Sequence, residues 1–310
     1  MQLAQGAGVA LFGALAVFAG SAALRRRPRR AAMRPGREAT VTAARRLNRA
    51  AGLIATSTLL DSGMEHYRGT FHNKAMVTPL VVSALALAVS AHGTRDKRKT
   101  AHRVRDSVYA SAALTGVAGT GFHVYNIGKR PGGFCWQNLF YGSPLGAPAA
   151  VALTGLLGYY SERLRESEGG ATPRVFGMPA GRTLAALTAA GLVATSGEAG
   201  LLHFRGAYHD PFMYVPVTVP PIAAMLLSET AATHPHRPRR LTRWWLRVTA
   251  LVGFLGAGFH VFGVSRNMGG WRNWSQNILV GPPIPAPPSF TGLALAGLAA
   301  LGLIEEHPRA

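Results

Sequence analysis

A histidine-rich segment that occurs twice constrains this chain more than any other feature. Residues 66–73 read HYRGTFHN and residues 203–210 read HFRGAYHD. A third histidine follows each segment, and its separation from the first is the same in both copies (123 − 66 = 57; 260 − 203 = 57). The chain is therefore a tandem duplication, and each copy carries a set of three histidines.

Long apolar stretches alternate with short basic runs along the chain. The excess of basic over acidic residues is 33 − 13 = +20, but these residues do not spread over one face. They lie between apolar stretches of about 17–22 residues, which match the hydrocarbon core of a bilayer. This pattern is typical of a polytopic membrane protein rather than a nucleic-acid-binding one. We expect an all-α integral membrane protein surrounded by lipid bilayer. A single cysteine, Cys135, excludes an intrachain disulfide.

The apolar pattern predicts about nine transmembrane helices, one N-terminal helix followed by two sets of four. An N-terminal helix (1–24) precedes a basic cytoplasmic linker (25–46). Repeat 1 (47–165) has predicted helices at 47–66, 72–91, 105–127 and 145–161. An inner linker (166–181) leads to repeat 2 (182–306), with predicted helices at 182–203, 210–230, 243–264 and 287–304. Because four is an even number, both repeats enter the membrane in the same direction and are parallel.

Loop charge predicts the orientation of the chain. The loops 92–105 and 234–247 are strongly basic, and basic loops tend to stay on the cytoplasmic side. The histidine turns then face outward, the N-terminus lies outside and the C-terminus inside. We expect the protein in a bacterial cytoplasmic membrane.

Histidines at membrane depth all belong to the duplicated set. An acid precedes the first histidine of each copy by five residues, and an ionisable group at that depth is costly unless it is paired or ligating. Such an acid could bind a metal directly or accept a hydrogen bond from a histidine ring. The predicted metal-site residues are His66, His72, His123, His203, His209 and His260, with the acids Asp61 and Glu198.

One interpretation of this set is b-type haem. Two histidines on facing helices, such as His66 and His123, would ligate the iron axially. Nearby glycines would let the porphyrin approach the backbone, and two arginines could pair with the haem propionates because guanidinium matches carboxylate geometry. These predicted cofactor-binding residues are Gly119, Gly121, Gly256, Gly258, Arg68 and Arg205.

A second interpretation is a non-haem iron or copper centre, which gives the third histidine of each copy a role. The copies could each hold one metal, or the six histidines could form one shared site. A third interpretation is structural, because histidines at helix ends often hydrogen-bond a carbonyl or a lipid head group.

We expect a membrane redox protein that passes electrons between quinone and an extracytoplasmic partner. Both turnover of a substrate and simple electron transfer are compatible with such centres. Two alternative functions do not involve redox chemistry in this chain. Parallel repeats with buried acids and histidines also suit a proton-coupled transporter, and a bundle of this kind could serve as the non-catalytic membrane anchor of a dehydrogenase.

Overall fold

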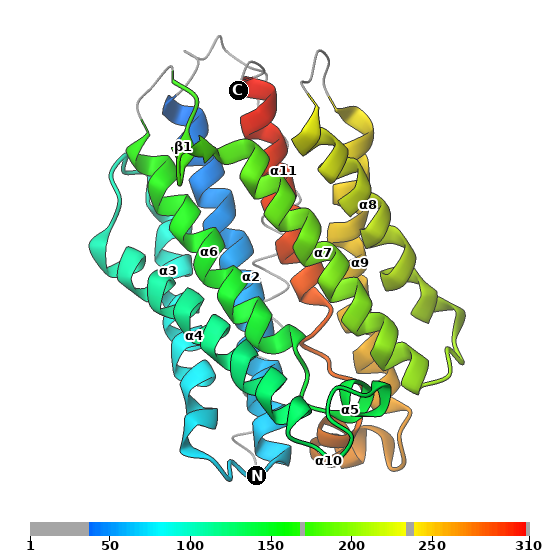
Figure 1. Ribbon diagram of the computed structural model, residues 1–310. Coiled ribbons are helices and arrows are strands. Elements are labelled where there is room, and N and C mark those ends of the chain that lie inside the picture. Colours follow the sequence, from blue (N-terminus) through cyan, green and yellow to red (C-terminus); the bar gives the residue numbers. More distant parts are fainter. Residues whose placement is uncertain (1–36, 168–170, 234–238, 308–310) are drawn as a thin grey trace.

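The computed structural model describes residues 37–167, 171–233 and 239–307, and it is an all-α bundle (Figure 1). The first half consists of α2 (Arg37–Arg68), η1 (Lys74–Val77), α3 (Thr78–Arg95), α4 (Arg103–Gly128), α5 (Trp136–Tyr141) and α6 (Gly146–Glu166). A two-stranded hairpin, β1 (Arg174–Val175) and β2 (Met178–Pro179), follows it. The second half consists of α7 (Ala180–Arg205), η2 (Pro211–Tyr214), α8 (Val215–Ala232), α9 (Arg240–Ser265), η3 (Gly270–Asn273), α10 (Trp274–Val280) and α11 (Pro288–Glu306).

Each of the eight helices predicted between residues 47 and 304 overlaps one long helix of the structure. The largest difference is in α2, which begins at Arg37 rather than at residue 47. Residues 37–46, predicted to belong to the basic linker, are therefore helical. Helix α6 also continues to Glu166, beyond its predicted end at residue 161. The helix predicted at 3–24 lies outside the described residues.

Five segments of the described chain are long and apolar enough to cross a membrane: Lys74–Arg95, Ala180–Arg205, Pro211–Ala232, Arg240–Ser265 and Pro288–Glu306. Large apolar side chains also cover the outer helices, among them Leu85 on α3, Leu114 on α4 and Leu251 on α9, each at least half exposed. Lipid is the surroundings in which such a surface is stable. The all-α class and the membrane surroundings are thus supported, whereas the nine-helix count and the parallel repeats stay predictions.

The core lies where α2, α6, α7 and α11 meet, with α3 and α4 on one side and α8 and α9 on the other (Figure 1). Small residues let these central helices approach closely. Gly292 of α11 shows this, because a side chain there would meet Ile54 and the carbonyl oxygen of Ala50 on α2. Since neighbours enclose α2, it can be less apolar than a helix that faces lipid.

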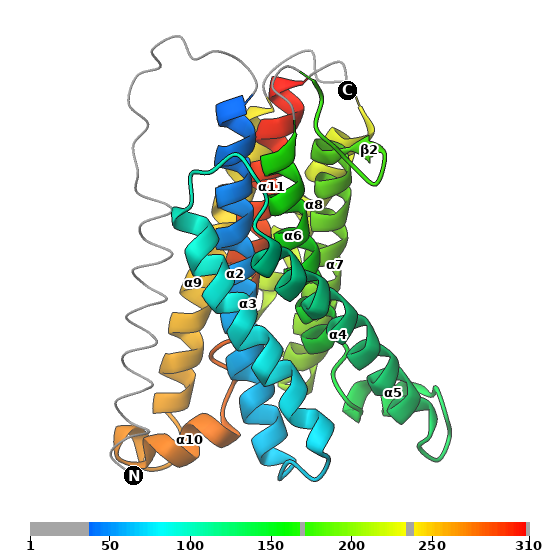
Figure 2. The same cartoon turned by 90° about the vertical axis from the view of Figure 1, so that its left-hand side faces the viewer.

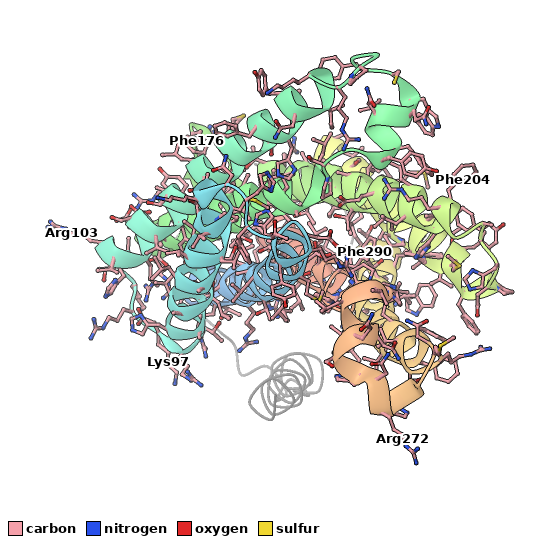
Figure 3. All side chains as sticks on the ribbon, turned by 90° about the horizontal axis from the view of Figure 1, so that it is seen from below. Lys97, Arg103, Phe176, Phe204, Arg272 and Phe290 are labelled. Atoms are coloured by element: carbon pink, nitrogen blue, oxygen red, sulfur yellow. The ribbon has the colours of Figure 1, made fainter. Side chains whose placement is uncertain are left out.

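The long helices run between two ends of the bundle, and the repeated histidines lie at one of them. Helices α2, α4, α7 and α9 all reach that end at their C-termini, close to the short helices α5 and α10 (Figures 1 and 2). The view from this end shows Phe204 of α7 and Arg272 of η3 toward the rim and Phe290 of α11 in the centre (Figure 3). The predicted convergence of the histidines in depth follows from this arrangement.

Candidate functional site

The repeated histidine segment forms the same tight turn in both copies. Two residues in each turn adopt the left-handed backbone conformation, Thr70 and Phe71 in the first copy and Ala207 and Tyr208 in the second. The glycine before them gives close packing, because a side chain on Gly69 would come within 3.2 Å of the terminal methyl of Met76 in the following 3-10 helix. Part of the sequence conservation between the copies thus has a structural cause.

The residue that ends each segment caps the next helix. Asn73 Oδ1 accepts the N–H of Ala75, and Asp210 Oδ1 accepts the N–H of Phe212, each at 2.9 Å. A side-chain acceptor at this position satisfies a backbone donor that the helix leaves free. Asn73 and Asp210 therefore need no role in ligand binding.

All six repeated histidines direct Nδ1 at a backbone carbonyl oxygen, and corresponding histidines use corresponding carbonyls. The distances are 2.5–2.7 Å for the four histidines borne on long helices and 2.9–3.0 Å for the two in the turns. The pairs are His66 with Met76, His123 with Pro144, His203 with Met213, His260 with Pro283, His72 with Gly69 and His209 with Gly206.

These contacts fix which ring nitrogen carries the hydrogen. A carbonyl oxygen can only accept, so Nδ1 is the donor and, in a neutral ring, Nε2 keeps its lone pair. Metal-ligating histidines commonly have this arrangement, with one nitrogen anchored and the other on the metal. The same contacts also tie helix ends to turns, so they serve the structural interpretation as well.

Two of the three histidines of each copy lie close together. His66 and His123 are within electrostatic range of each other, and so are His203 and His260. The third member, such as His72, is exposed in its turn. Within the described residues, no three histidine, cysteine, aspartate or glutamate side chains form a group that could hold a metal ion. The structure thus brings together pairs of histidines rather than the predicted sets of three.

The two glycines before the third histidine have different surroundings. A side chain on Gly119 would contact Pro148 at 3.2 Å, and one on Gly256 would contact Pro287 at 2.8 Å. The first glycine of each pair therefore permits close helix packing. A side chain on Gly121 would meet nothing within 4 Å. Gly258, its counterpart, is equally open. Open space therefore adjoins the backbone two residues before His123 and two residues before His260.

The predicted acids lie near the border between the two copies. Glu198 of α7 accepts the backbone N–H of Gly146, the first residue of α6, at 3.1 Å. Asp61 of α2 lies within electrostatic range of Glu198. Neither acid accepts a hydrogen bond from a histidine Nδ1, because carbonyl oxygens fill that role. The structure therefore places the two acids within electrostatic range of each other and Glu198 at the N-terminus of α6.

The predicted propionate partners contact other groups. Arg68 Nη1 forms an ion pair with Glu65, and its Nε donates to the carbonyl oxygen of Leu279 on α10. The guanidinium of Arg205 lies over the ring of Phe140 at 4.9 Å and over that of Tyr141 at 5.3 Å. Both arginines thus join one copy to the short helix of the other.

A pair of asparagines has a role that sequence reasoning missed. Asn138 Nδ2 donates to the carbonyl oxygens of Pro131 and Gly133, which folds back the loop after α4. Asn277 does the same with Met268 and Gly270. The repeated Gln-Asn dipeptide was the available signal.

A buried charge network at the opposite end of the bundle was also missed. Arg105 is fully buried and binds Glu162 through Nε and Asp96 through Nη1, each at 2.8 Å. Glu162 Oε2 also accepts the N–H of His102, which precedes α4. Removal of one partner from such a pair would leave an uncompensated buried charge and strongly destabilise the fold. The network lies far from the repeated histidines along the bundle.

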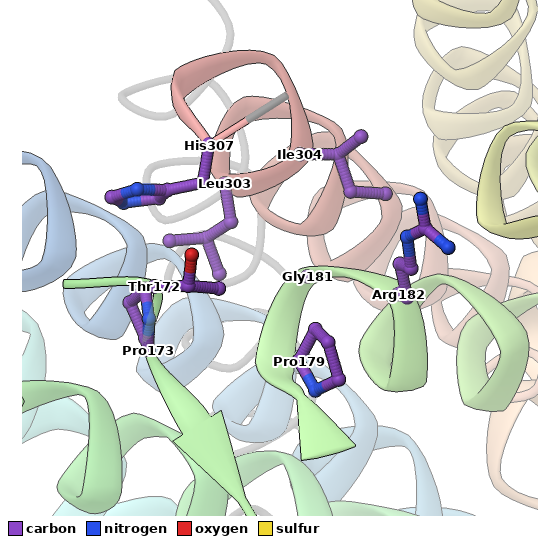
Figure 4. A pocket seen from close by; sticks show the side chains of 8 residues that line it. All are labelled: Thr172, Pro173, Pro179, Gly181, Arg182, Leu303, Ile304 and His307. Carbon is purple, nitrogen blue, oxygen red and sulfur yellow. The ribbon is translucent and has the colours of Figure 1, made fainter. Parts of the chain in front are cut away.

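The same end has a small pocket between the hairpin and α11 (Figure 4). Its volume is about 10 Å³, which is close to the space that one water needs. The buried Nε2 of His307 on its wall has no hydrogen-bond partner within the described residues. The pocket suits a single water and is too small for a substrate. Its walls are Thr172, Pro173, Pro179, Gly181, Arg182, Leu303, Ile304 and His307.

Comparison of the chain with protein families, curated proteins and solved structures gives no match.

Proposed function

We propose that this chain is an integral membrane redox protein with one histidine-ligated metal centre in each copy. His66 and His123 ligate the first centre, and His203 and His260 ligate the second. The observation that carries the proposal is the shared anchoring of these four rings, in which Nδ1 donates to a carbonyl and Nε2 is left to bind a metal. Their close pairing within each copy supports it.

Haem is the cofactor that this donor set fits best. Axial ligation of a b-type haem needs two imidazoles, which is the number that lie together in each copy. A bound haem would supply reversible one-electron transfer. A non-haem iron or copper site would require a third ligand to move toward each pair.

The electrons pass between a quinol in the bilayer and an extracytoplasmic acceptor protein. Oxidation of one quinol releases two electrons, which two one-electron centres would accept one each, and two protons, which leave to the outer aqueous side. Both centres are at one end of the bundle, so the chain alone does not carry electrons across the membrane. The exposed apolar helices support access for a quinol from the lipid.

Quinol-driven reduction tests this function. Purified protein in lipid vesicles is mixed with a short-chain quinol, and the absorption bands of the reduced centre are followed with time. We expect the bands to appear without dithionite and to disappear when a soluble oxidant is added outside. A centre that dithionite reduces but quinol leaves oxidised would contradict the proposed electron donor.

Proton-coupled transport is the second candidate, and the acids favour it. Asp61 and Glu198 lie close to each other between the copies, and such a pair could share and release a proton. Vesicles that contain the protein would then acidify when substrate is supplied. Asp61→Asn would abolish the acidification, and the protein would contain no stoichiometric metal.

A further inference from the structure

Each copy reaches across to the short helix of the other at one junction. Arg68 of the first copy contacts Leu279 of α10, and Arg205 of the second contacts Phe140 of α5. These contacts involve corresponding positions, because the two Gln-Asn dipeptides align at an offset of 139 and 279 − 139 = 140. The two junctions can therefore be compared residue by residue.

The junction at α5 is filled by aromatic side chains. Phe140 is only 6% exposed, and its ring meets the ring of Phe204 edge to face with 5.7 Å between centroids. Tyr141 lies beside it under the guanidinium of Arg205. The buried ring of Phe140 thus fills the space between the histidine turn and the short helix, whereas Tyr141 is mostly exposed.

The junction at α10 has smaller residues and is open. Leu279 stands in the place of Phe140, and Val280 stands in the place of Tyr141. A wide, open depression lies here, and its wall residues Tyr67 and Val280 are mostly exposed. Helix α10 lies across the end of α9, on the side of the turn after α2 (Figure 2). The pocket walls are Tyr67, Arg68, Thr70, Phe71, Leu279 and Val280.

The chemistry of these walls favours a neutral aromatic ligand. Tyr67 and Phe71 offer ring faces, and Leu279 and Val280 offer apolar surface. The hydroxyls of Tyr67 and Thr70 can hydrogen-bond a carbonyl or hydroxyl oxygen on the ligand. Arg68 does not bring a free charge, because Glu65 pairs with it. An anionic lipid head group would have to compete with that carboxylate.

We propose that the pocket at the α10 junction binds the ring of a quinone or quinol. The α5 junction, its counterpart, does not. Electron transfer from the bound ligand rests on the proposed function. Binding of the ligand does not, because it requires no metal. Tyr67 and Arg68 directly follow His66 in the chain, so the pocket lies at the same end of the bundle as the first histidine pair. The buried ring of Phe140 occupies the matching position in the second copy.

Photolabelling tests the pocket directly. Purified protein in detergent is illuminated with a photoreactive azidoquinone, and the labelled peptides are identified by mass spectrometry. We expect label on residues 67–71 and 279–280, with competition by unlabelled quinone. The double variant L279F/V280Y copies the residues of the filled junction and should reduce labelling at least tenfold. Leu251→Phe, on the exposed face of α9, is the matched control and should label as the wild type does.

Two results would overturn the proposal. One is unchanged labelling of L279F/V280Y when its thermal unfolding midpoint equals that of the wild type. The other is displacement of the probe by phosphatidylglycerol but not by quinone, which would assign the pocket to a lipid head group. A protein that labels but lacks metal would refute only the proposed redox function. A metal-containing protein that never labels would refute only the pocket.

Discussion

At the level of single residues, hydrogen bonds to backbone carbonyls fix the orientation of each repeated histidine ring. In each helix-borne histidine, a carbonyl from a different element fixes Nδ1, as Pro144 does for His123. The turn histidines use a carbonyl only three residues away, as Gly69 does for His72. Long-range anchoring holds a ring relative to a second helix, whereas local anchoring only closes a turn. The helix-borne rings are therefore the expected ligands.

Substitution of single histidines distinguishes a site with two histidine ligands from a site with three. His66→Ala should remove one centre and leave the other, so bound metal per protein should fall by about half. His72→Ala should leave both metal content and absorption bands unchanged, because His72 lies exposed in its turn. Metal analysis and visible spectra of the two variants check this expectation. Loss of both centres in His66→Ala would point instead to a shared site, and loss of metal in His72→Ala would restore the three-histidine set.

At the element scale, α4 packs tightly on α6 at one level and has open space beside it at another. A side chain on Gly116 would come within 2.1 Å of the backbone nitrogen of Ala152. Beside Gly121, five residues further on, a side chain would meet nothing within 4 Å. The tight contact holds α4 in place on α6, and the open level is on the exposed surface of α4.

Matched glycine substitutions test this difference. Gly116→Ala should lower the free energy of unfolding by about 1–3 kcal/mol, because overpacking forces the helices apart. Gly121→Ala should leave stability equal or raise it by up to about 1 kcal/mol, because alanine favours the helix and nothing stands in its way. Denaturation in detergent measures both. Equal losses in the two variants would contradict the described packing.

The charge network at the opposite end predicts a dependence of stability on pH. Burial alone would raise the pKa of Asp96, but the N–H of Arg98 and the guanidiniums of Arg105 and Arg165 outweigh it and hold the pKa below its usual value. A lowered pKa in the folded state adds stability above the unfolded value of about 3.9, and that stability is lost as pH falls through the folded pKa.

The unfolding midpoint should therefore drop as pH is lowered from 5 toward 3, and Asp96→Asn should flatten this drop. Midpoints measured across that range in both proteins provide the comparison. Parallel curves for wild type and variant would show that other groups cause the acid sensitivity.

Helices and turns were predictable from sequence because their signals are local. Apolar length located eight helices, and the repeated segment located both turns. Contacts between distant residues were not predictable. The pairing of Arg105 with Glu162 spans 57 positions, and nothing in the spacing of residues showed which face of α6 would meet α4. The direction of each imidazole depended in the same way on carbonyls from other elements, such as Met76 for His66.

At the scale of the whole molecule, the two copies share a scaffold but differ at the junctions between them. Corresponding histidines, asparagines and arginines make corresponding contacts, which indicates that both copies retain one folding plan. The exchange of Phe140 for Leu279 then leaves one junction filled and the other open. In the proposed function, duplication supplies the two metal sites, and divergence at the junctions supplies the one ligand pocket.

The orientation of the chain in the membrane is a prediction at this scale. With nine membrane crossings and basic loops inside, a tag at the N-terminus should be accessible from outside and a tag after Ala310 only from inside. Protease or antibody access in intact cells and in opened cells distinguishes the two sides. Access to both tags from one side would mean an even number of crossings.

The central claim is that paired histidines hold one metal centre in each copy. Its most direct test is the absorption spectrum of detergent-purified protein, oxidised and then reduced with dithionite, with metal analysis of the same sample. We expect a Soret band that sharpens on reduction and about two haem irons per chain. A folded, colourless protein without iron or copper would contradict it and would favour transport.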